Sequence, residues 1–365
     1  MKSLRDINLK RNPFSDTTPS RDRHGYFWAG MTSVKEKIQD CYESCLSSNT
    51  KQLILNWGPY GGGKTFSAYY FLDKYSNKKN NITQVYLRSP KDGSKLAREI
   101  FNAIIDELTF EAIAERVKSL KKNFTEQNLL RYLSSKAGVE YAKAIITIGS
   151  DDEDIQGLMN RFLYTGTLTA SEMRSLGLAK PIKTDSDLIK FLTGLLSCFA
   201  ISQGRQKGRL VIWFDEMEDI IYYPTKHYKA FSQFLRDLYD NVSDNLLIFL
   251  NFTLAEGEES TIELILGTAL WSRITRKIRY KDFNYNDAFQ YADDLLNEVR
   301  IDKQNPQPIS EQNLKKLLSI LPLGNLTPRE INKHMSSIIN FLKLKDLTEI
   351  DDVVINGFVE QQDDL

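Results

Sequence analysis

The stretch Gly58-Pro59-Tyr60-Gly61-Gly62-Gly63-Lys64-Thr65 has the spacing of a phosphate-binding loop, in which a glycine and four further residues precede Gly-Lys-Thr. Such a loop lets successive backbone N–H groups curl around an anionic phosphate chain, and the helix that follows points its positive end at the same place. The flanks fit, because residues 52–57 form a short apolar run typical of a buried strand and residues 65–74 have helical periodicity. The alternative interpretation is a glycine-rich turn that binds no ligand. Such a turn would not require a strand before it and a helix after it.

The loop also predicts which residues bind ATP and its magnesium ion. Lys64 is expected to reach the β- and γ-phosphates, and Thr65 is expected to place its hydroxyl on Mg²⁺. The residues predicted to bind the nucleotide from this stretch are Gly58, Pro59, Tyr60, Gly61, Gly62, Gly63, Lys64, Thr65 and Phe66.

A second apolar run, residues 209–214, ends in Asp215 and Glu216. Continuous apolar runs are typical of parallel strands that are buried on both faces, and ligands bind at the carboxyl ends of such strands. We therefore expect Asp215 near Mg²⁺, directly or through water, and Glu216 as the base that orients and deprotonates the attacking water. A surface Asp-Glu pair is the alternative. Glu218 and Asp219 are expected to form a charge cluster at a helix N-terminus.

The bulk composition sets limits on the class of protein. The chain has 365 residues, enough for about two domains, and its 48 basic residues balance 48 acidic ones. Zero net charge argues against a wholly basic nucleic-acid binder but permits a local basic patch. The three cysteines, Cys41, Cys45 and Cys198, show no disulfide framework. With no apolar run near roughly 18 residues and no signal-peptide core, we expect a cytoplasmic protein that does not bind membranes.

The order of apolar runs predicts an α/β fold with a parallel five-stranded sheet, helices on both faces, a helical insert and an α-helical lid. The expected strands are residues 52–57, 82–88, 209–216, 246–253 and 277–283. The expected helices outside the insert are 31–48, 65–74, 95–108, 186–203, 286–300, 310–321, 328–343 and 348–360. The predicted division is an N-terminal segment and helix (1–50), a nucleotide-binding core (51–285, with the insert at about 110–185), and a lid with an acidic tail (286–365).

This series of elements resembles the AAA+ ATPases over most of the chain. The resemblance implies that Asn251, with Thr253 as a neighbouring candidate, senses the γ-phosphate from a strand end. It implies that Arg273, in Ser272-Arg273-Ile274, acts across a subunit interface, with Arg276 as the next candidate. It also implies that Arg329 of the lid touches the nucleotide, although two residues separate the asparagine and proline of the motif at 324–329.

Each of these residues could also serve the structure alone, without contacting the nucleotide. Arg273 and Arg276 belong to a basic ribbon that could simply face solvent. Arg329 follows Pro328, a good first residue of a helix, so its side chain could only decorate the first turn. Asn251, as a buried amide, must hydrogen-bond something.

Two details point to particular branches of that family. Asn12-Pro13-Phe14 and the helix before the first strand look like the replication-initiator and transposition-regulator branch. Residues 162–166, 172–177 and 215–218 look like the ATP-binding proteins of BREX-type bacterial anti-phage systems. Residues 28–31 stand where initiators carry a glycine-arginine pair, which leaves the adenine pocket undefined. No winged-helix segment is evident after the lid, which disfavours a replication-origin role.

Three functions follow as hypotheses. The first is a Mg²⁺-dependent ATPase that assembles into a ring or filament on binding ATP and acts on DNA or a partner protein, in a defence or mobile-element system. The second is a nucleotide-gated signalling switch with slow hydrolysis. The third is an ATPase similar to replication initiators. The Asp215-Glu216 pair favours hydrolysis, since a pure switch needs no base.

Overall fold

The computed structural model describes residues 3–76, 81–179, 181–182, 184–201, 207–254, 259–305, 307–320 and 326–363. The chain divides into two compact units. The first comprises Met1–Lys37, Trp57–Lys74 and Arg279–Leu365, and the second comprises Ile38–Asn56 and Tyr75–Ile278. The phosphate loop therefore belongs to the first unit, whereas the Asp-Glu strand belongs to the second.

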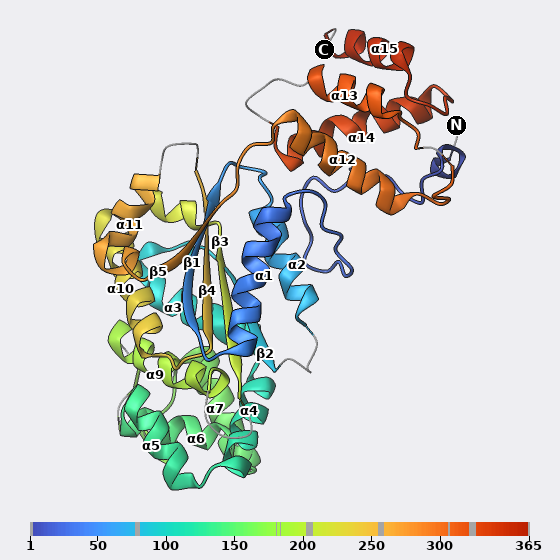
Figure 1. Ribbon diagram of the computed structural model, residues 1–365. Coiled ribbons are helices and arrows are strands. Elements are labelled where there is room, and N and C mark those ends of the chain that lie inside the picture. The colour runs from blue at the N-terminus through green and yellow to red at the C-terminus, as the bar shows by residue number, and fades with distance from the viewer. Residues whose placement is uncertain are drawn as a thin grey trace. The chain divides into compact units, whose positions relative to one another are not determined.

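A five-stranded parallel sheet, ordered β2-β3-β4-β1-β5, confirms the predicted α/β fold (Figure 1). Its strands are β1 (Lys51–Gly58), β2 (Ile82–Arg88), β3 (Arg209–Asp215), β4 (Leu246–Thr253) and β5 (Ile274–Arg279). Two of the four neighbouring pairs, β2-β3 and β3-β4, are consecutive in sequence, whereas β4-β1 and β1-β5 are not, and parallel neighbours are joined by crossover connections that contain helices. The register pairs Arg88 with Asp215 at the carboxyl ends of β2 and β3.

The helices of the two units are as follows. The second unit contains α3 (Leu96–Leu108), α4 (Phe110–Asn123), α5 (Glu126–Ala137), α6 (Val139–Ile148), α7 (Glu153–Thr165), α8 (Ala170–Ser175), α9 (Asp185–Phe199), α10 (Thr225–Asn241) and α11 (Glu259–Trp271). The first unit contains α2 (Lys64–Lys74), α12 (Tyr285–Val299), α13 (Glu311–Ile320), α14 (Pro328–Leu344) and α15 (Asp352–Asp363), and α1 (Thr32–Ser47) runs from the first unit into the second. Within the described residues, no helix has both the length and the apolar character of a membrane span.

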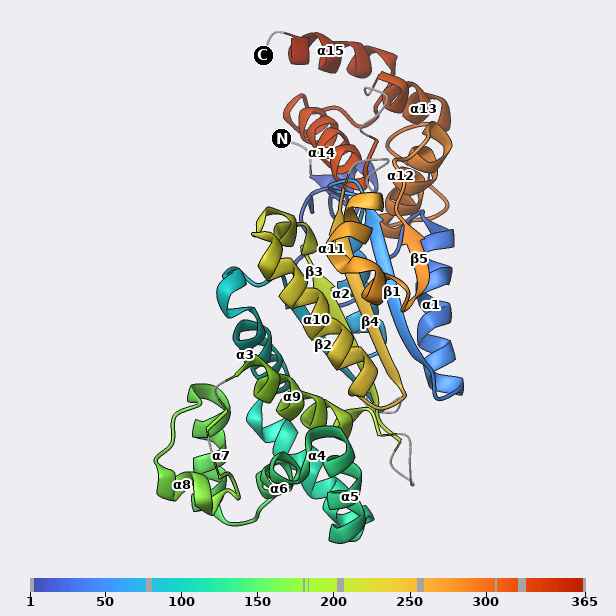
Figure 2. The same cartoon turned by 90° about the vertical axis from the view of Figure 1, so that its left-hand side faces the viewer.

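Aromatic side chains show which helix covers each face of the sheet. Trp213 of β3 stacks on Phe249 of β4, and Tyr42 of α1 stacks on Phe249 and accepts a hydrogen bond of 3.1 Å from the Trp213 indole. The next residue, Phe214, contacts Phe231 of α10 instead. Since successive strand residues point to opposite faces, α1 and α10 cover opposite faces of the sheet (Figure 2).

Helices α4 to α8 fill the stretch between β2 and β3 that the sequence suggests is an insert. Helices α4 to α7 pack among themselves and against α3 and α9 through buried apolar side chains (Figure 2). Their starts follow capping chemistry, since the Thr109 and Thr125 hydroxyls accept hydrogen bonds from the first turns of α4 and α5. Glycines at 138 and 166 end α5 and α7 with positive φ.

The first unit packs the N-terminal segment against the helices of the lid. Leu9 and Phe14 are fully buried in the same apolar core as α12, α13 and α14. Asn12 accepts a hydrogen bond from the Phe14 N–H (3.0 Å) and donates to Ser336 of α14 (3.0 Å). The Asn-Pro-Phe sequence therefore forms a local turn that ties this segment to the lid.

The predicted fifth strand is present, but its predicted bounds, residues 277–283, were wrong because β5 spans Ile274–Arg279. Tyr280 makes one more backbone hydrogen bond, from its N–H to the Trp57 carbonyl (2.7 Å). Phe283 then donates its N–H to the Leu326 carbonyl and packs in the lid core. The Phe283 side chain is therefore buried in the core of the lid and not against the sheet. The alternation of apolar and polar residues along the sequence is the same in both cases, so it cannot distinguish them.

Candidate functional site

The phosphate loop holds its lysine against its own backbone. The Lys64 ammonium donates hydrogen bonds to the carbonyls of Gly58 (2.9 Å) and Pro59 (2.8 Å), and the side chain is buried. Lys64 and Thr65 open α2, so the N–H groups of its first turn and the positive end of its dipole face the loop. A buried cation beside the N-terminus of a helix forms a site suited to a chain of phosphates.

Two glycines in this loop require their lack of a side chain. Gly61 has φ +76°, and a Cβ placed on it would lie 2.8 Å from the Arg329 Cβ. Gly63 has φ +95°, and its Cβ would lie 2.9 Å from the Met31 methyl carbon. A side chain at either position would be strained by the backbone conformation, and at Gly61 it would also collide with the Arg329 Cβ.

Arg329 lies against the phosphate loop from the first turn of α14. Its guanidinium carbon is 4.1 Å from the centroid of the Tyr60 ring, and its Nε donates to the Thr17 carbonyl (3.2 Å). Tyr60 itself is 71% exposed, so the stack lies at the surface of the unit. The structure thus brings Arg329 to the loop that the sequence predicts it serves, whereas residues 324–325 of the proposed motif lie outside the described residues.

Asp215 ends β3 as a buried carboxylate with two side-chain donors. The Tyr86 hydroxyl donates to its Oδ2 (2.7 Å), and the Asn251 amide donates to its Oδ1 (3.0 Å). Asn251 in turn accepts a hydrogen bond of 2.9 Å from Asn56 of β1. The structure therefore brings Asp215 and Asn251 together, as two sequence-predicted residues, and adds Tyr86 and Asn56, which sequence reasoning missed.

Glu216 follows Asp215 in a left-handed backbone conformation, with φ +58°. Its carboxylate is half-exposed and lies 3.8 Å from the Arg88 Nε at the end of β2. Burial is the main cause that raises the pKa of Glu216 above its ordinary value, while the Arg88 charge acts to lower it. A glutamate with a raised pKa beside a strand end is suited to accept a proton from water.

Glu218 has a structural partner. In the short 3₁₀-helix η4 (Met217–Tyr222), its carboxylate accepts a hydrogen bond of 3.0 Å from the Thr253 N–H at the end of β4. This contact occupies Glu218 and links the turn after β3 to the end of β4.

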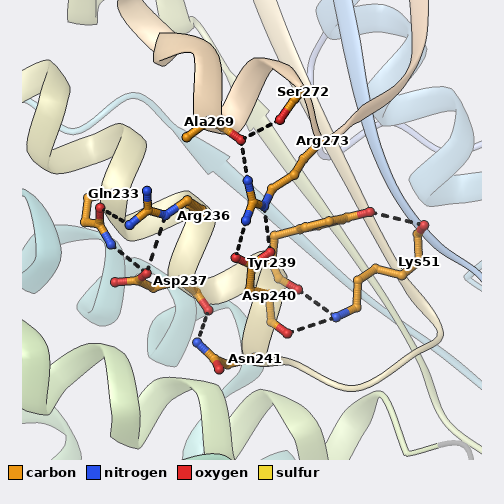
Figure 3. Close-up of polar contacts among 10 residues, drawn as sticks. All are labelled: Lys51, Gln233, Arg236, Asp237, Tyr239, Asp240, Asn241, Ala269, Ser272 and Arg273. Atoms are coloured by element: carbon orange, nitrogen blue, oxygen red, sulfur yellow. Dashed lines mark hydrogen bonds and ion pairs between the residues drawn. The ribbon is translucent and has the colours of Figure 1, made fainter.

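Arg273 is bound within its own chain (Figure 3). Its guanidinium makes two parallel hydrogen bonds of 2.7 Å to the Asp240 carboxylate at the end of α10, and it also donates to the Ala269 carbonyl. These hydrogen bonds lower the pKa of Asp240 below its ordinary value. On the same helix end, the Lys51 ammonium donates to the carbonyls of Tyr239 (2.7 Å) and Val242 (2.6 Å).

Two cations of β5, Arg276 and Lys277, also have partners. Arg276 lies 3.4 Å from the Asp40 carboxylate, and Lys277 lies 2.7 Å from that of Glu259 and 3.9 Å from the centroid of the Trp271 ring. Three of the five cations between residues 273 and 281, namely Arg273, Arg276 and Lys277, are thus held in ion pairs by carboxylates of three different helices.

The side chains of the site are of the chemical types that bind magnesium and phosphate. Magnesium prefers oxygen ligands and keeps several waters, so it needs only one or two protein groups, and the Asp215 carboxylate of the second unit is a group of this kind. In the described part of the chain, no cluster of three or more histidine, cysteine, aspartate or glutamate side chains forms a metal site. The glycine cradle with its buried lysine is the feature that fits phosphate.

Comparison with known proteins gives no match to a family model and none to a curated protein. Among solved structures, the chain is similar to the ORC2 protein of Aeropyrum pernix in ADPNP–ADP complexes, with a TM-score of 0.55 and 10% identity over 96% of this chain and 72% of that one. The ORC1 protein of Aeropyrum pernix in complex with DNA gives 0.52 and 10% over 99% and 71%. Drosophila ORC bound to DNA gives 0.50 and 8% over 94% and 66%. At this identity the likeness concerns the fold, so the chain has an AAA+-like fold similar to that of ORC proteins.

Proposed function

We propose that this protein binds ATP with Mg²⁺ and hydrolyses it to ADP and inorganic phosphate. The observation that carries the proposal is the phosphate loop, where a buried Lys64 and glycines of positive φ form a cradle at the start of α2. In the second unit, the adjacent carboxylates of Asp215 and Glu216 supply the groups that hydrolysis needs. The two groups lie in different units, and their joint action is inferred from the motifs in the sequence.

The chain's residues have distinct roles in this reaction. Lys64 would exchange the carbonyls of Gly58 and Pro59 for phosphate oxygens, while Thr65 and Asp215 would hold Mg²⁺, which neutralises charge on those oxygens. Glu216 would accept a proton from a water whose oxygen attacks the γ-phosphorus. The bond between that phosphorus and the bridging oxygen breaks, and ADP carries away the electron pair.

We further propose assembly into a ring or filament on ATP binding, with Arg273 acting on a neighbouring subunit. The AAA+ resemblance supports this, and two of the similar solved structures are ORC proteins bound to DNA, so DNA or a partner protein is the proposed target. Because Asp240 holds Arg273 within the chain, the trans role requires exchange of that ion pair. The setting in defence or mobile elements rests on the sequence resemblance alone.

Two further functions remain as alternatives. In a signalling switch, nucleotide binding would set the conformation and hydrolysis would be slow, whereas an initiator-like ATPase would bind origin DNA. A steep rise of the ATPase rate per subunit with protein concentration supports the assembling ATPase, and a flat, low rate supports the switch.

The test of nucleotide binding is Lys64→Ala. We expect this variant to lose equilibrium ATP binding, because the loop would face the phosphates without its point charge. Lys74→Ala, which changes an exposed lysine at the other end of the same helix, is the control and should bind like wild type. Unchanged ATP affinity in a folded Lys64→Ala protein would overturn the phosphate-loop assignment.

A further inference from the structure

Four polar side chains form a continuous row across four neighbouring strands. Tyr86 of β2 donates to Asp215 of β3, Asn251 of β4 donates to the other oxygen of Asp215, and Asn56 of β1 donates to Asn251. The distances are 2.7, 3.0 and 2.9 Å. All four lie in the second unit, and none is more than 6% exposed.

The direction of the row is set by its carboxylate. An ionised aspartate can only accept hydrogen bonds, so Asn251 must turn its NH₂ group toward Asp215. Its Oδ1 then faces Asn56, which must turn its own NH₂ group toward Asn251. As a result the Asn56 Oδ1, buried at 0% exposure, has no hydrogen-bond partner among the described residues. Leaving a buried acceptor unpaired destabilises the fold, so the orientation of this amide costs stability.

We propose that Tyr86 and Asn56 are positioning residues for magnesium-dependent nucleotide binding, and this inference rests on the proposed function. Tyr86 fixes one carboxylate oxygen of Asp215, and Asn56 fixes the amide that holds the other. Each oxygen of the carboxylate keeps one further lone pair for Mg²⁺ or a magnesium-bound water. The row thus prevents Asp215 from rotating away from the strand ends.

The main test compares Tyr86→Phe with Tyr141→Phe. Tyr141 is a close match, because its hydroxyl also donates to an aspartate, Asp187, at 2.7 Å, and it is 5% exposed. Its place on α6, in the helical insert, separates it from the strand ends. Each variant removes one hydroxyl from a buried ring, so any loss of folding stability should be comparable.

The readout is the Kd of a non-hydrolysable ATP analogue, measured by calorimetry in magnesium and in EDTA. Removing the hydrogen-bond partner of a metal-binding group typically costs about 10-fold to 100-fold in metal affinity. We therefore expect the Kd of Tyr86→Phe to rise by about that factor in magnesium but not in EDTA. Tyr141→Phe should match wild type in both buffers.

Asn56→Asp provides a second variant that keeps the shape of the side chain. Its new carboxylate cannot donate to the Asn251 Oδ1, so Asn251 has an acceptor on both sides and its NH₂ group is no longer directed to Asp215 alone. The same magnesium-specific loss should follow. Asn245→Asp is the control, because Asn245 is also buried and donates to a carbonyl (Gly208, 3.2 Å), and its Oδ1 has no hydrogen-bond partner in the described part of the chain. It precedes β4, at the end of the strand opposite to Asn251.

The outcomes separate this inference from the proposed function. If wild type binds the analogue more tightly in magnesium and Tyr86→Phe and Asn56→Asp do the same, the positioning role is overturned while nucleotide binding stands. An equal loss in Tyr141→Phe, or a loss in EDTA as large as in magnesium, also overturns it. If wild type binds no analogue in either buffer, the proposed function itself fails.

Discussion

Replacing Asp240 with asparagine should release Arg273 for use on a neighbouring subunit. The two side chains form a bidentate pair at 2.7 Å with side-chain exposures of 31% and 40%, and the guanidinium is also tied to the Ala269 carbonyl (Figure 3). Asp240→Asn removes the negative charge but keeps a side chain of the same shape. If Arg273 acts in trans, its pairing with Asp240 competes with assembly.

The size of the effect follows from the exposure of the pair. Solvent-exposed ion pairs contribute about 0.2–1 kcal/mol, and the bidentate geometry places this one near the upper end. Since 1.4 kcal/mol corresponds to a factor of ten, releasing about 1 kcal/mol should favour the trans arrangement roughly fivefold. Salt screens such pairs, so the gain should shrink as ionic strength rises.

The assay is the ATPase rate per subunit as a function of protein concentration. Asp240→Asn should reach half-maximal rate at a protein concentration roughly fivefold lower than wild type. Arg273→Ala should lose the concentration-dependent part, because an arginine finger is typically worth about 10³–10⁵ in rate. Arg236→Ala, which removes an arginine of the same helix that donates to Gln233 rather than to Asp240, is the control.

A mixing experiment checks the same reasoning independently. Arg273→Ala and Glu216→Gln subunits, each inactive alone, should recover some activity when combined, since mixed interfaces pair an intact arginine with an intact glutamate. Wild-type concentration dependence in Arg273→Ala, or no recovery from co-assembled subunits, would refute the trans role. Arg273 would then only join the end of α11 to α10, and Arg276 would be the next candidate.

Two other substitutions test the two halves of the site. Gly61→Ala should abolish ATP binding, because the new Cβ would lie 2.8 Å from the Arg329 Cβ at a residue with φ +76°, while Gly157→Ala, whose Cβ would meet nothing within 4 Å, should bind ATP normally; equal affinities in the two would contradict the close approach. Arg88→Met should shift the acid limb of the pH–rate profile to higher pH. Glu216 must be deprotonated to act, so the rate falls as the pH drops through its pKa. Burial already raises this pKa, and loss of the Arg88 charge should raise it further. If the acid limb does not move, either Glu216 is not the group that titrates there or Arg88 does not affect its pKa.

Much of the sheet could be predicted because buried parallel strands are nearly continuous apolar runs. The ranges predicted for β2 and β4, residues 82–88 and 246–253, coincide with the strands, and the carboxylates at the end of β3 were located by the same reasoning. The last strand was misplaced, since Phe283 continues the alternation but packs in the lid core.

The partners of the predicted site residues could not be read from the sequence. Tyr86 and Asp215 are 129 residues apart, and Asn56 and Asn251 are 195 apart. Their contacts depend on the strand order and register, which local patterns do not encode. A polar residue within an otherwise apolar strand, such as Asn56, was the signal available, and it gains meaning only once β1 is known to lie beside β4.

The central claim is that Glu216 acts as the base in ATP hydrolysis, and its most direct test is the rate of phosphate release from saturating Mg²⁺-ATP by Glu216→Gln. The amide keeps the shape of the side chain but cannot accept the proton from water. With ATP affinity unchanged, we expect the rate to fall by about 10²–10⁴ relative to wild type. Phosphate release at the wild-type rate would contradict the account.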